Sequence, residues 1–287
     1  MAPVGILVVI GSVIGGYLLA HGNLSVLWQP AELVVIFGAA FGSLLIASPG
    51  KVLGLVFKGF GKVFADHKIG KAQYLDLLML LYGIFYKIKK DGLISVESDV
   101  DNYQKSPLFL KYPAILKDHH TCEFICDTIR TMVSANFPAH ELENLMDIDL
   151  EANHHQAMIP PHCITTLGDS MPGLGIVAAV LGVVNTMGKI NEPPEVLGHH
   201  IGGALVGTFL GILASYGFIG PMGGNLTRKA EEHAGYMNVV KTALIAGYST
   251  DFMVQFAIEA GRRAIPGDDR PSFAEVESAI KQWKTKN

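Results

Sequence analysis

The stretch SMPGLGIVAAVLGVVNTMG at 170–188 decides the fold, because it contains no Asp, Glu, Lys or Arg. A membrane-spanning helix needs about 20 mainly apolar residues, which is the length of this stretch. Three more stretches of this kind lie at 1–31, 33–50 and 196–227. Helices of a water-soluble protein normally keep a charged face, and these keep none. The pattern therefore favours membrane helices over four buried core helices.

The sequence therefore predicts an all-α integral membrane protein with four transmembrane helices. A cleaved signal peptide is the alternative for the first stretch, but it lacks a basic start and a second apolar run follows almost at once. We predict these domains: 1–50 with the first two spans (about 2–21 and 32–49), a cytoplasmic helical domain at 51–168, 169–225 with the other two spans (about 169–188 and 198–224), and cytoplasmic C-terminal helices at 226–287.

Composition and charge narrow the class of protein further. Only 17% of the 287 residues are charged, against about 25% in soluble domains. The net charge of −4 gives no reason to expect a nucleic-acid partner, and three cysteines cannot form a disulfide framework. Lys189 is the only Lys or Arg between Arg130 and Arg228. The positive-inside rule therefore places both polar segments and both termini in the cytoplasm.

Hydrophobic periodicity predicts that the polar segments are helical too. Residues 71–90 place apolar side chains at helical spacing, and Asp91-Gly92 supplies the stop. The other predicted helices lie at 108–118, at 120–135, at 138–157 with an end before Pro160-Pro161, at 226–261 as a continuation of the fourth span, and from 271–273 onward.

Small residues at four-residue spacing mark the spans as closely packed. Such positions let helix backbones approach each other, which is a major source of association in lipid. The alternative is that glycine is simply frequent in membrane helices. Three sets favour a tight bundle and an oligomer: Gly11 with Gly15, Gly38 with Gly42, and Gly203 with Gly207 and Gly211.

Each of the two later spans contains a proline near its predicted cytoplasmic end. A proline inside a helix removes a hydrogen bond and kinks the helix, so Pro172 and Pro221 are candidates for a bend or hinge. For Pro172 an equally good alternative is a position in the first turn of a helix whose N-cap is Asp169 or Ser170.

The most informative absence is a carboxylate near the middle of a span. Ion transport through lipid normally relies on an intramembrane Asp, Glu or His, and we expect Glu32, His199 and His200 near the outer face. If the protein conducts ions, another chain must then supply the titrating group. Thr208 is the best candidate for lining the path. Its alternative role is a hydrogen bond to the carbonyl four residues earlier.

No motif indicates catalysis, a cofactor or a metal. Cys122 and Cys126 follow His119-His120, but the histidines do not fall reliably on the cysteine face, so buried thiols are favoured over a zinc site. The chain contains no P-loop, no Rossmann glycine fingerprint and no nucleophile elbow. We therefore predict that it is not an enzyme.

The order of spans and polar segments resembles the flagellar motor stator subunits of the MotA/TolQ/ExbB proton channel family. Stretches that carry the resemblance are GGYLLAHGNLSVLWQPAELVVIFGAAFGS at 15–43, LGDSMPGLGIVAAVLGVV at 167–184, LVGTFLGILASYGFIGP at 205–221 and RPSFAEVE at 270–277. The relatives TolQ and ExbB have three spans, so the pair of N-terminal spans separates a stator subunit from an energiser of outer-membrane processes.

The resemblance implies an ion-driven torque generator in the bacterial inner membrane. It implies a ring of five such subunits in membrane lipid around two copies of a MotB-type single-span partner, whose essential Asp supplies the missing carboxylate. It further implies that the ring acts on the rotor protein FliG. The alternatives are an ExbB- or TolQ-like energiser and a non-conducting membrane scaffold.

The resemblance also assigns roles to single residues. It implies a rotor interface at Lys89 and Glu97, and Lys90 can share the role of Lys89, since the family usually has Arg there. It implies that Pro172 and Pro221 couple ion flow to motion.

The same resemblance implies that Thr208 lines the ion path. Sodium-driven relatives carry Thr where this chain has Ala179 and Gly207. Fewer hydroxyl oxygens replace a sodium hydration shell poorly, so we predict that the transported ion is H⁺ and that no cofactor is bound.

Overall fold

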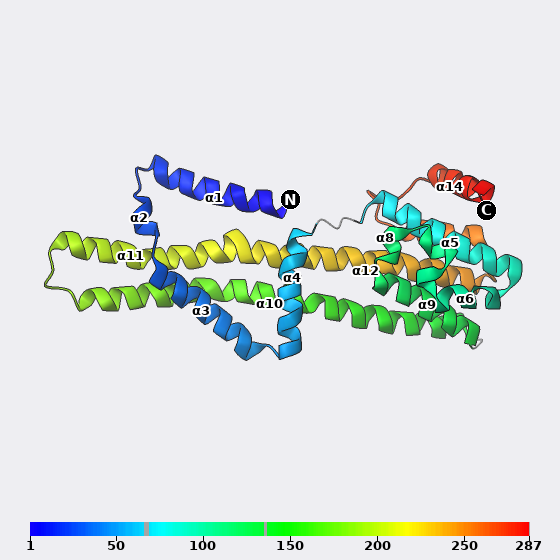
Figure 1. Cartoon of the computed structure of the whole chain (residues 1–287), viewed down its shortest axis with the longest axis horizontal. Coiled ribbons are helices and arrows are strands. Elements are labelled where there is room, and N and C mark those ends of the chain that lie inside the picture. Colours follow the sequence, from blue (N-terminus) through cyan, green and yellow to red (C-terminus); the bar gives the residue numbers. More distant parts are fainter. Residues whose placement is uncertain (66–68, 135–136, 287) are drawn as a thin grey trace. The chain divides into compact units, whose positions relative to one another are not determined.

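The computed structural model describes residues 1–65, 69–134 and 137–286, and every regular element in these ranges is a helix (Figure 1). Four helical stretches are long and apolar enough to cross a membrane: Ala2–Leu19, Leu24–Ala47, Ala139–Met187 and Pro194–Ser249. This confirms the predicted fold class and the number of spans.

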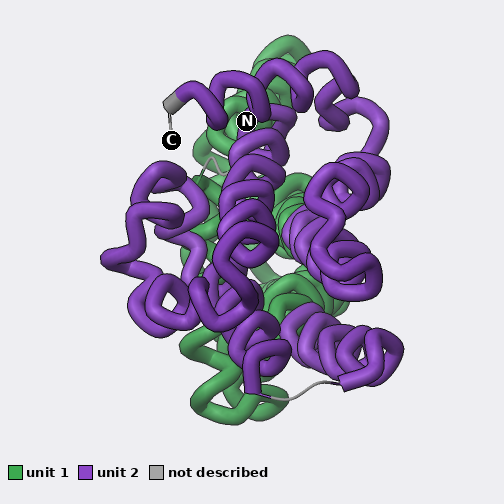
Figure 2. Tube along the Cα trace, turned by 90° about the vertical axis from the view of Figure 1, so that its right-hand side faces the viewer, with its two compact units in different colours: residues 1–66, 156–230 green, residues 67–155, 231–287 purple. Residues whose placement is uncertain are grey.

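The chain forms two compact units, coloured separately in Figure 2. Unit 1 comprises residues 1–66 and 156–230, and unit 2 comprises residues 67–155 and 231–287. These boundaries group 51–66 and 156–168 with the apolar helices, whereas the sequence places them in a cytoplasmic domain. Where the membrane surface crosses the chain stays a prediction.

Unit 1 contains the apolar helices. Its elements are α1 (Ala2–Leu19), α2 (Leu24–Leu27), α3 (Pro30–Ala47), α4 (Gly50–Phe64), the later part of α10 (Ala139–Met187), α11 (Pro194–Ile212), the π-helix η3 (Leu213–Ile219) and the first part of α12 (Gly220–Ser249). No residue of α1 is buried within the described chain. An apolar helix with no buried face needs lipid or another subunit around it.

Unit 2 is built around one central helix. Its elements are α5 (Lys71–Asp91), η1 (Leu93–Val96), α6 (Glu97–Asp101), η2 (Tyr103–Lys105), α7 (Pro107–Leu110), α8 (Pro113–Leu116), α9 (His119–Ser134), the first part of α10, the later part of α12, α13 (Val254–Ala264) and α14 (Phe273–Lys286). The helix predicted at 71–90 is confirmed as α5. Leu77, Leu81 and Phe85 of this helix are completely buried.

The predicted helix at 108–118 is wrong, because the structure divides it into α7 and α8. Each of the two short helices begins at a proline, Pro107 or Pro113. Tyr112 has φ −123° and ψ 70°, outside the helical region. A residue before proline is sterically pushed out of the α conformation, which explains the break.

The helix predicted at 138–157 does not end before Pro160-Pro161. Instead α10 continues through Pro160, Pro161 and Pro172. Gly59 of α4 lies against the ring of Pro160, close enough that a methyl group built on Gly59 would lie 3.0 Å from the proline Cβ. Packing of this kind can hold a helix straight through a proline that would end it in isolation.

The continuation predicted at 226–261 also breaks. Helix α12 ends at Ser249, and α13 begins at Val254. Between them Asp251 and Phe252 have positive φ angles of 50° and 53°. Local sequence gave no glycine or proline to mark this break, so isolated helix propensity could not locate it.

Cys122 and Cys126 are completely buried in α9, as predicted. Burial raises the pKa of both thiols to about 12. Both thiols are therefore protonated at neutral pH, as expected of inert core cysteines.

Candidate functional site

The first candidate site is the crossing of α10 and α11 in unit 1, where the two helices lie side by side (Figure 1). A methyl group built on Gly211 would lie 2.6 Å from the Met171 carbonyl oxygen and 2.8 Å from Gly175 Cα. One built on Gly175 would lie 2.8 Å from the Gly207 carbonyl oxygen. The crossing therefore brings two backbones into direct contact, and side chains larger than hydrogen cannot fit at these positions without a shift.

The predicted glycine sets divide into two groups. Gly203, Gly207 and Gly211 all lie in close contacts within the chain, Gly203 against the amide of Gln29. The other two sets, Gly11 with Gly15 and Gly38 with Gly42, have no atom of this chain within 4 Å of an added methyl group. The role of these two sets in packing against other subunits stays a prediction.

The predicted ion-path residues lie together at this crossing. The backbone nitrogen of Ala179 lies 3.2 Å from a methyl group built on Gly207, the residue before Thr208. Among the described residues, no hydrogen bond is formed by the Thr208 hydroxyl, so the alternative role of Thr208 is not realised. By contrast, Thr186 on α10 donates to the Gly182 carbonyl oxygen at 2.8 Å. The Thr208 hydroxyl is therefore available to another group.

Glu32 reaches the same crossing, although its position in the sequence does not indicate this contact. Its side chain comes from the first turn of α3, and the residue is only 8% exposed. A methyl group on Gly207 would lie 2.5 Å from Glu32 Oε2, and one on Gly182 would lie 3.1 Å from Oε1. Within the described chain Oε2 has no hydrogen-bond partner. The carboxyl group of Glu32 thus packs between α10 and α11, and its place near the outer face stays a prediction.

Both predicted coupling prolines lie near a second close approach, between α10 and the start of α12. A methyl group on Gly168 would lie 3.2 Å from the Gly220 backbone nitrogen. Pro221 follows directly, and the Gly220 N–H donates to the Ser215 carbonyl five residues earlier, as in a π-helix. A π-turn beside a proline is a common cause of a local bend.

Pro172 lies four residues after Gly168, inside α10. The alternative in which Asp169 or Ser170 caps a helix start is therefore wrong. The Ser170 hydroxyl instead donates to the Leu167 carbonyl at 2.7 Å. Without an N–H on Pro172, the Gly168 carbonyl loses its partner within the helix. Both prolines thus weaken the backbone ladder close to the same helix contact.

The second candidate site is the exposed end of α5 in unit 2. Lys89 and Lys90 occupy the last turn of α5, Glu97 begins α6, and all three residues are exposed. Gly92 lies between the helices with a φ of 87°, which a residue with a side chain adopts at a steric cost. The turn therefore carries exposed side chains of both charge signs.

A partly buried ion pair fixes the position of this turn. The Lys87 ammonium donates to Asp99 Oδ2 at 2.6 Å, and the Ser106 hydroxyl donates to Asp99 Oδ1 at 2.7 Å. Lys87 lies two residues before Lys89, and Asp99 lies two residues after Glu97. Because the Asp99 side chain is only 10% exposed, this network links α5, α6 and α7 at a defined place.

Comparison with known proteins identifies the family. The N-terminal domain of motility protein A matches residues 3–92, and the MotA/TolQ/ExbB proton channel family matches residues 117–238. The chain is 41% identical to motility protein A of Escherichia coli strain K12 over 98% of this chain and 95% of the relative. The chain belongs to the motility protein A family.

Other members of this family agree with that assignment. Chemotaxis protein LafT of Vibrio parahaemolyticus is 32% identical over 95% of both chains. A structure of C. jejuni MotAB gives a TM-score of 0.76 at 20% identity, covering 95% of this chain and 98% of that chain. The flagellar MotAB stator complex from Bacillus subtilis gives 0.72 at 19% identity, covering 98% of each. The solved structures confirm the fold.

Membership of this family relates the chain to the motility proteins and to the MotA/TolQ/ExbB proton channels. Its relatives are motility and chemotaxis proteins rather than enzymes, which confirms that prediction. The predicted roles of single residues are not tested by these similarities.

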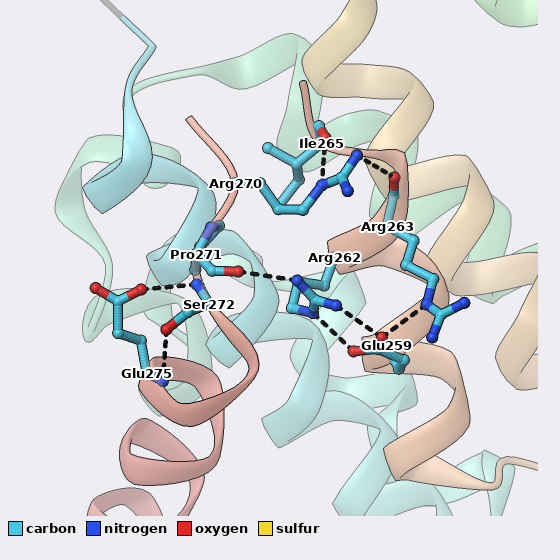
Figure 3. Close-up of polar contacts among 8 residues, drawn as sticks. All are labelled: Glu259, Arg262, Arg263, Ile265, Arg270, Pro271, Ser272 and Glu275. Carbon is cyan, nitrogen blue, oxygen red and sulfur yellow. Dashed lines mark hydrogen bonds and ion pairs between the residues drawn. The ribbon is translucent and has the colours of Figure 1, made fainter. Parts of the chain in front are cut away.

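The family-like stretch at 270–277 has a structural role in unit 2 (Figure 3). Ser272 and Glu275 form a capping box at the start of α14, with Ser272 N–H donating to Glu275 Oε2 at 2.7 Å and Glu275 N–H to Ser272 Oγ at 3.3 Å. Arg270 donates to the carbonyl groups of Ile265 and Arg263. The bonds of Arg270 hold the connection between α13 and α14, and the capping box begins α14.

The same connection is tied to α13 by a cluster of charges. Glu259 accepts from Arg262 at 2.7 and 2.8 Å and from Arg263 at 2.8 Å, and Arg262 also donates to the Pro271 carbonyl. The hydrogen bonds from Arg262 lower the pKa of Glu259 to about 2. Partial burial raises this pKa, but the hydrogen bond from Arg263 and the positive charges of both arginines add to the lowering. The stretch therefore positions α14 against the rest of unit 2.

Proposed function

We propose that this chain is the ring subunit of a flagellar stator that conducts protons together with a MotB-type partner. The match to motility protein A along nearly the full chain carries the proposal. The partner's single span brings the Asp that titrates during transport, and the unbonded Thr208 hydroxyl beside the α10–α11 crossing lines the path. The complex lies in the bacterial inner membrane with both termini in the cytoplasm.

Five copies surround two copies of the partner. The apolar surface of α1 and the open faces at Gly11, Gly15, Gly38 and Gly42 support contacts beyond a single chain and its lipid. The two prolines near the Gly168–Gly220 contact convert ion passage into helix movement. Rotation of the ring then reaches the rotor through the exposed end of α5.

At that end Lys89, Lys90 and Glu97 act on FliG through complementary charges. Their exposure and the rigid Lys87–Asp99 support suit a contact that must transmit force. An energiser of outer-membrane processes is the less favoured alternative, because residues 3–92 match the N-terminal domain of the motility proteins.

A deletion strain tests the proposal directly. Cells that lack this chain and any second stator should keep their filaments and lose swimming, and the wild-type chain should restore it. Persistent swimming in the deletion strain would overturn the proposal. Lys90→Glu should slow rotation, and a compensating charge change in FliG should restore part of the speed.

The transported ion needs a separate measurement. Ala179 and Gly207 offer no hydroxyl oxygens at the two positions where sodium-driven relatives carry Thr, so speed should follow the proton-motive force. Swimming speed that follows external sodium at constant proton-motive force would contradict proton use without affecting the stator assignment.

A further inference from the structure

Unit 2 has an open hollow of about 380 Å³ beside the exposed end of α5. It is formed by the last turns of α5, the α12–α13 connection, the start of α13 and the end of α14. The lining residues are Tyr82, Tyr86, Lys89, Lys90, Phe252, Met253, Val254, Gln255, Phe256 and Lys284. The predicted rotor contact at Lys89 and Lys90 is thus one wall of a larger surface.

The floor and one rim of the hollow are apolar. Phe252 is buried, with its ring 6.1 Å from the ring of Phe85. Met253 and Phe256 are 60% and 54% exposed, although both are large apolar residues. Exposed apolar side chains gathered around a hollow are typical of a surface that binds another protein.

The backbone that carries this rim is held in a strained conformation. Asp251 and Phe252 both adopt the left-handed region, which is costly for residues with side chains. The Phe252 N–H donates to the Gly247 carbonyl at 2.7 Å, and Lys89 Nζ donates to the Asp251 carbonyl at 3.0 Å. These bonds turn Phe252 inward and leave the next residue, Met253, exposed.

The other walls of the hollow are basic. Three lysines line it, Lys89, Lys90 and Lys284, and no carboxylate occurs among the lining residues that the structure describes. Lys89 is partly engaged by the Asp251 carboxylate at 3.3 Å, but the side chains of this pair are 53% and 96% exposed. An ion pair this exposed exchanges readily for another carboxylate.

We propose that the hollow receives a large apolar side chain of the rotor protein, presented by a segment whose neighbouring residues are acidic. Apolar burial on Phe252, Met253 and Phe256 supplies affinity, and the three lysines select the acidic segment. The proposal rests on the proposed function, and it adds an apolar anchor to the charge contacts at Lys89, Lys90 and Glu97.

Photo-crosslinking in swimming cells tests the anchor. The full chain carries benzoylphenylalanine at position 256 or, as the control, at position 273, where Phe273 on α14 is 64% exposed outside the hollow. We expect a FliG adduct, identified by antibody, about tenfold stronger from position 256 than from position 273. Equal adducts, no adduct, or an adduct only to lipid or a second copy of this chain would overturn the proposal.

Substitutions separate this proposal from the stator assignment. Phe256→Asp should reduce the FliG adduct formed from benzoylphenylalanine at position 253 and lower swimming speed, while Phe256→Leu should retain both. Lys284→Glu should lower speed, while Lys281→Glu, one turn earlier on α14 and outside the hollow, should not. If the wild-type chain restores swimming and both hollow variants, assembled normally, swim at wild-type speed, the anchor is wrong and the stator assignment stands.

Discussion

The α10–α11 crossing in unit 1 and the α5 core in unit 2 are packed by opposite means. At the crossing, glycines bring backbone atoms together, and a methyl group on Gly211 would meet the Met171 carbonyl at 2.6 Å. In unit 2, large side chains such as Leu81 and Phe85 fill the space around a central helix. Water drives the second arrangement by the hydrophobic effect, whereas apolar burial gives little advantage to a helix already in lipid.

The two regions also differ in the hydrogen bonding of their polar groups. In unit 2 the Asp99 carboxylate accepts from Lys87 and Ser106. At the crossing, Glu32 Oε2 and the Thr208 hydroxyl have no partner among the described residues. The Asp99 carboxylate is thus satisfied by its own chain, while the polar groups of the crossing are available to a group from outside it.

The largest effect should come from removing bulk in unit 2. Phe85→Ala deletes a completely buried ring that contacts Gly247 and lies near Phe252. We expect a loss of about 3–5 kcal/mol in the free energy of unfolding of the detergent-solubilised protein, measured with urea. Phe273→Ala, at a residue 64% exposed, should change it by less than about 0.5 kcal/mol. Similar losses for both variants would contradict the core assignment.

Adding bulk should be the damaging change at the crossing. Gly211→Ala forces the backbones of α10 and α11 apart, and we expect a cost of about 1–3 kcal/mol and a matching loss of assembled, functional stator. Gly54→Ala on α4 is the control, because an added methyl group there meets nothing within 4 Å. Thermal unfolding and swimming speed measure both. A harmless Gly211→Ala would mean that the crossing is looser than the structure indicates.

Much of this contrast could be predicted from the sequence, because both regions follow simple periodic rules. Charge-free stretches gave the four spans, and helical spacing gave α5 and its buried residues. The glycine stripe on α11 was visible at four-residue spacing. Such patterns are local, so they need no knowledge of which helix packs on which.

The sequence could not reveal features that depend on a partner helix. Pro160 and Pro161 end a helix by local rules, but Gly59 of α4 packs on Pro160 and α10 continues. Glu32 was placed by its distance along the chain, which does not show that its side chain enters a groove lined by Gly182 and Gly207. The break at Asp251 and Phe252 has no glycine or proline to mark it.

The ion pairs of unit 2 should give it a pH dependence. Asp118 accepts from His233 Nε2 at 2.9 Å and from the Thr121 hydroxyl at 2.7 Å. Burial alone would raise the pKa of Asp118, but the hydrogen bonds and charge of His233, with the bonds from Thr121, lower the pKa to about 2. The ordinary value is 3.8, so the folded state keeps this group ionised to lower pH than the unfolded state does.

This carboxylate therefore contributes its stability above about pH 4 and loses it as the pH falls through about 2. The contribution is about 2 kcal/mol, so Asp118→Asn should be less stable by that amount at pH 7 and equal to wild type near pH 2. Urea unfolding across this range measures the difference, with the exposed Asp268→Asn as the control. A gap that stays constant with pH would contradict the role of Asp118.

The smallest effect should come from neutralising the unpaired carboxyl group at the crossing. Glu32→Gln keeps the shape that packs on Gly207 and removes no hydrogen bond of Oε2 within the described chain, so unfolding of this chain in detergent should change by less than about 0.5 kcal/mol. Asp99→Asn, which weakens the partly buried pair with Lys87, should cost about 1–3 kcal/mol. If Glu32→Gln is neutral in the single chain but destabilises the complex with its single-span partner, Glu32 has its partner on another subunit. If both variants lost equal free energy of unfolding in the single chain, Glu32 would be paired within the chain as Asp99 is. The difference between the two regions in their buried polar groups would then be wrong.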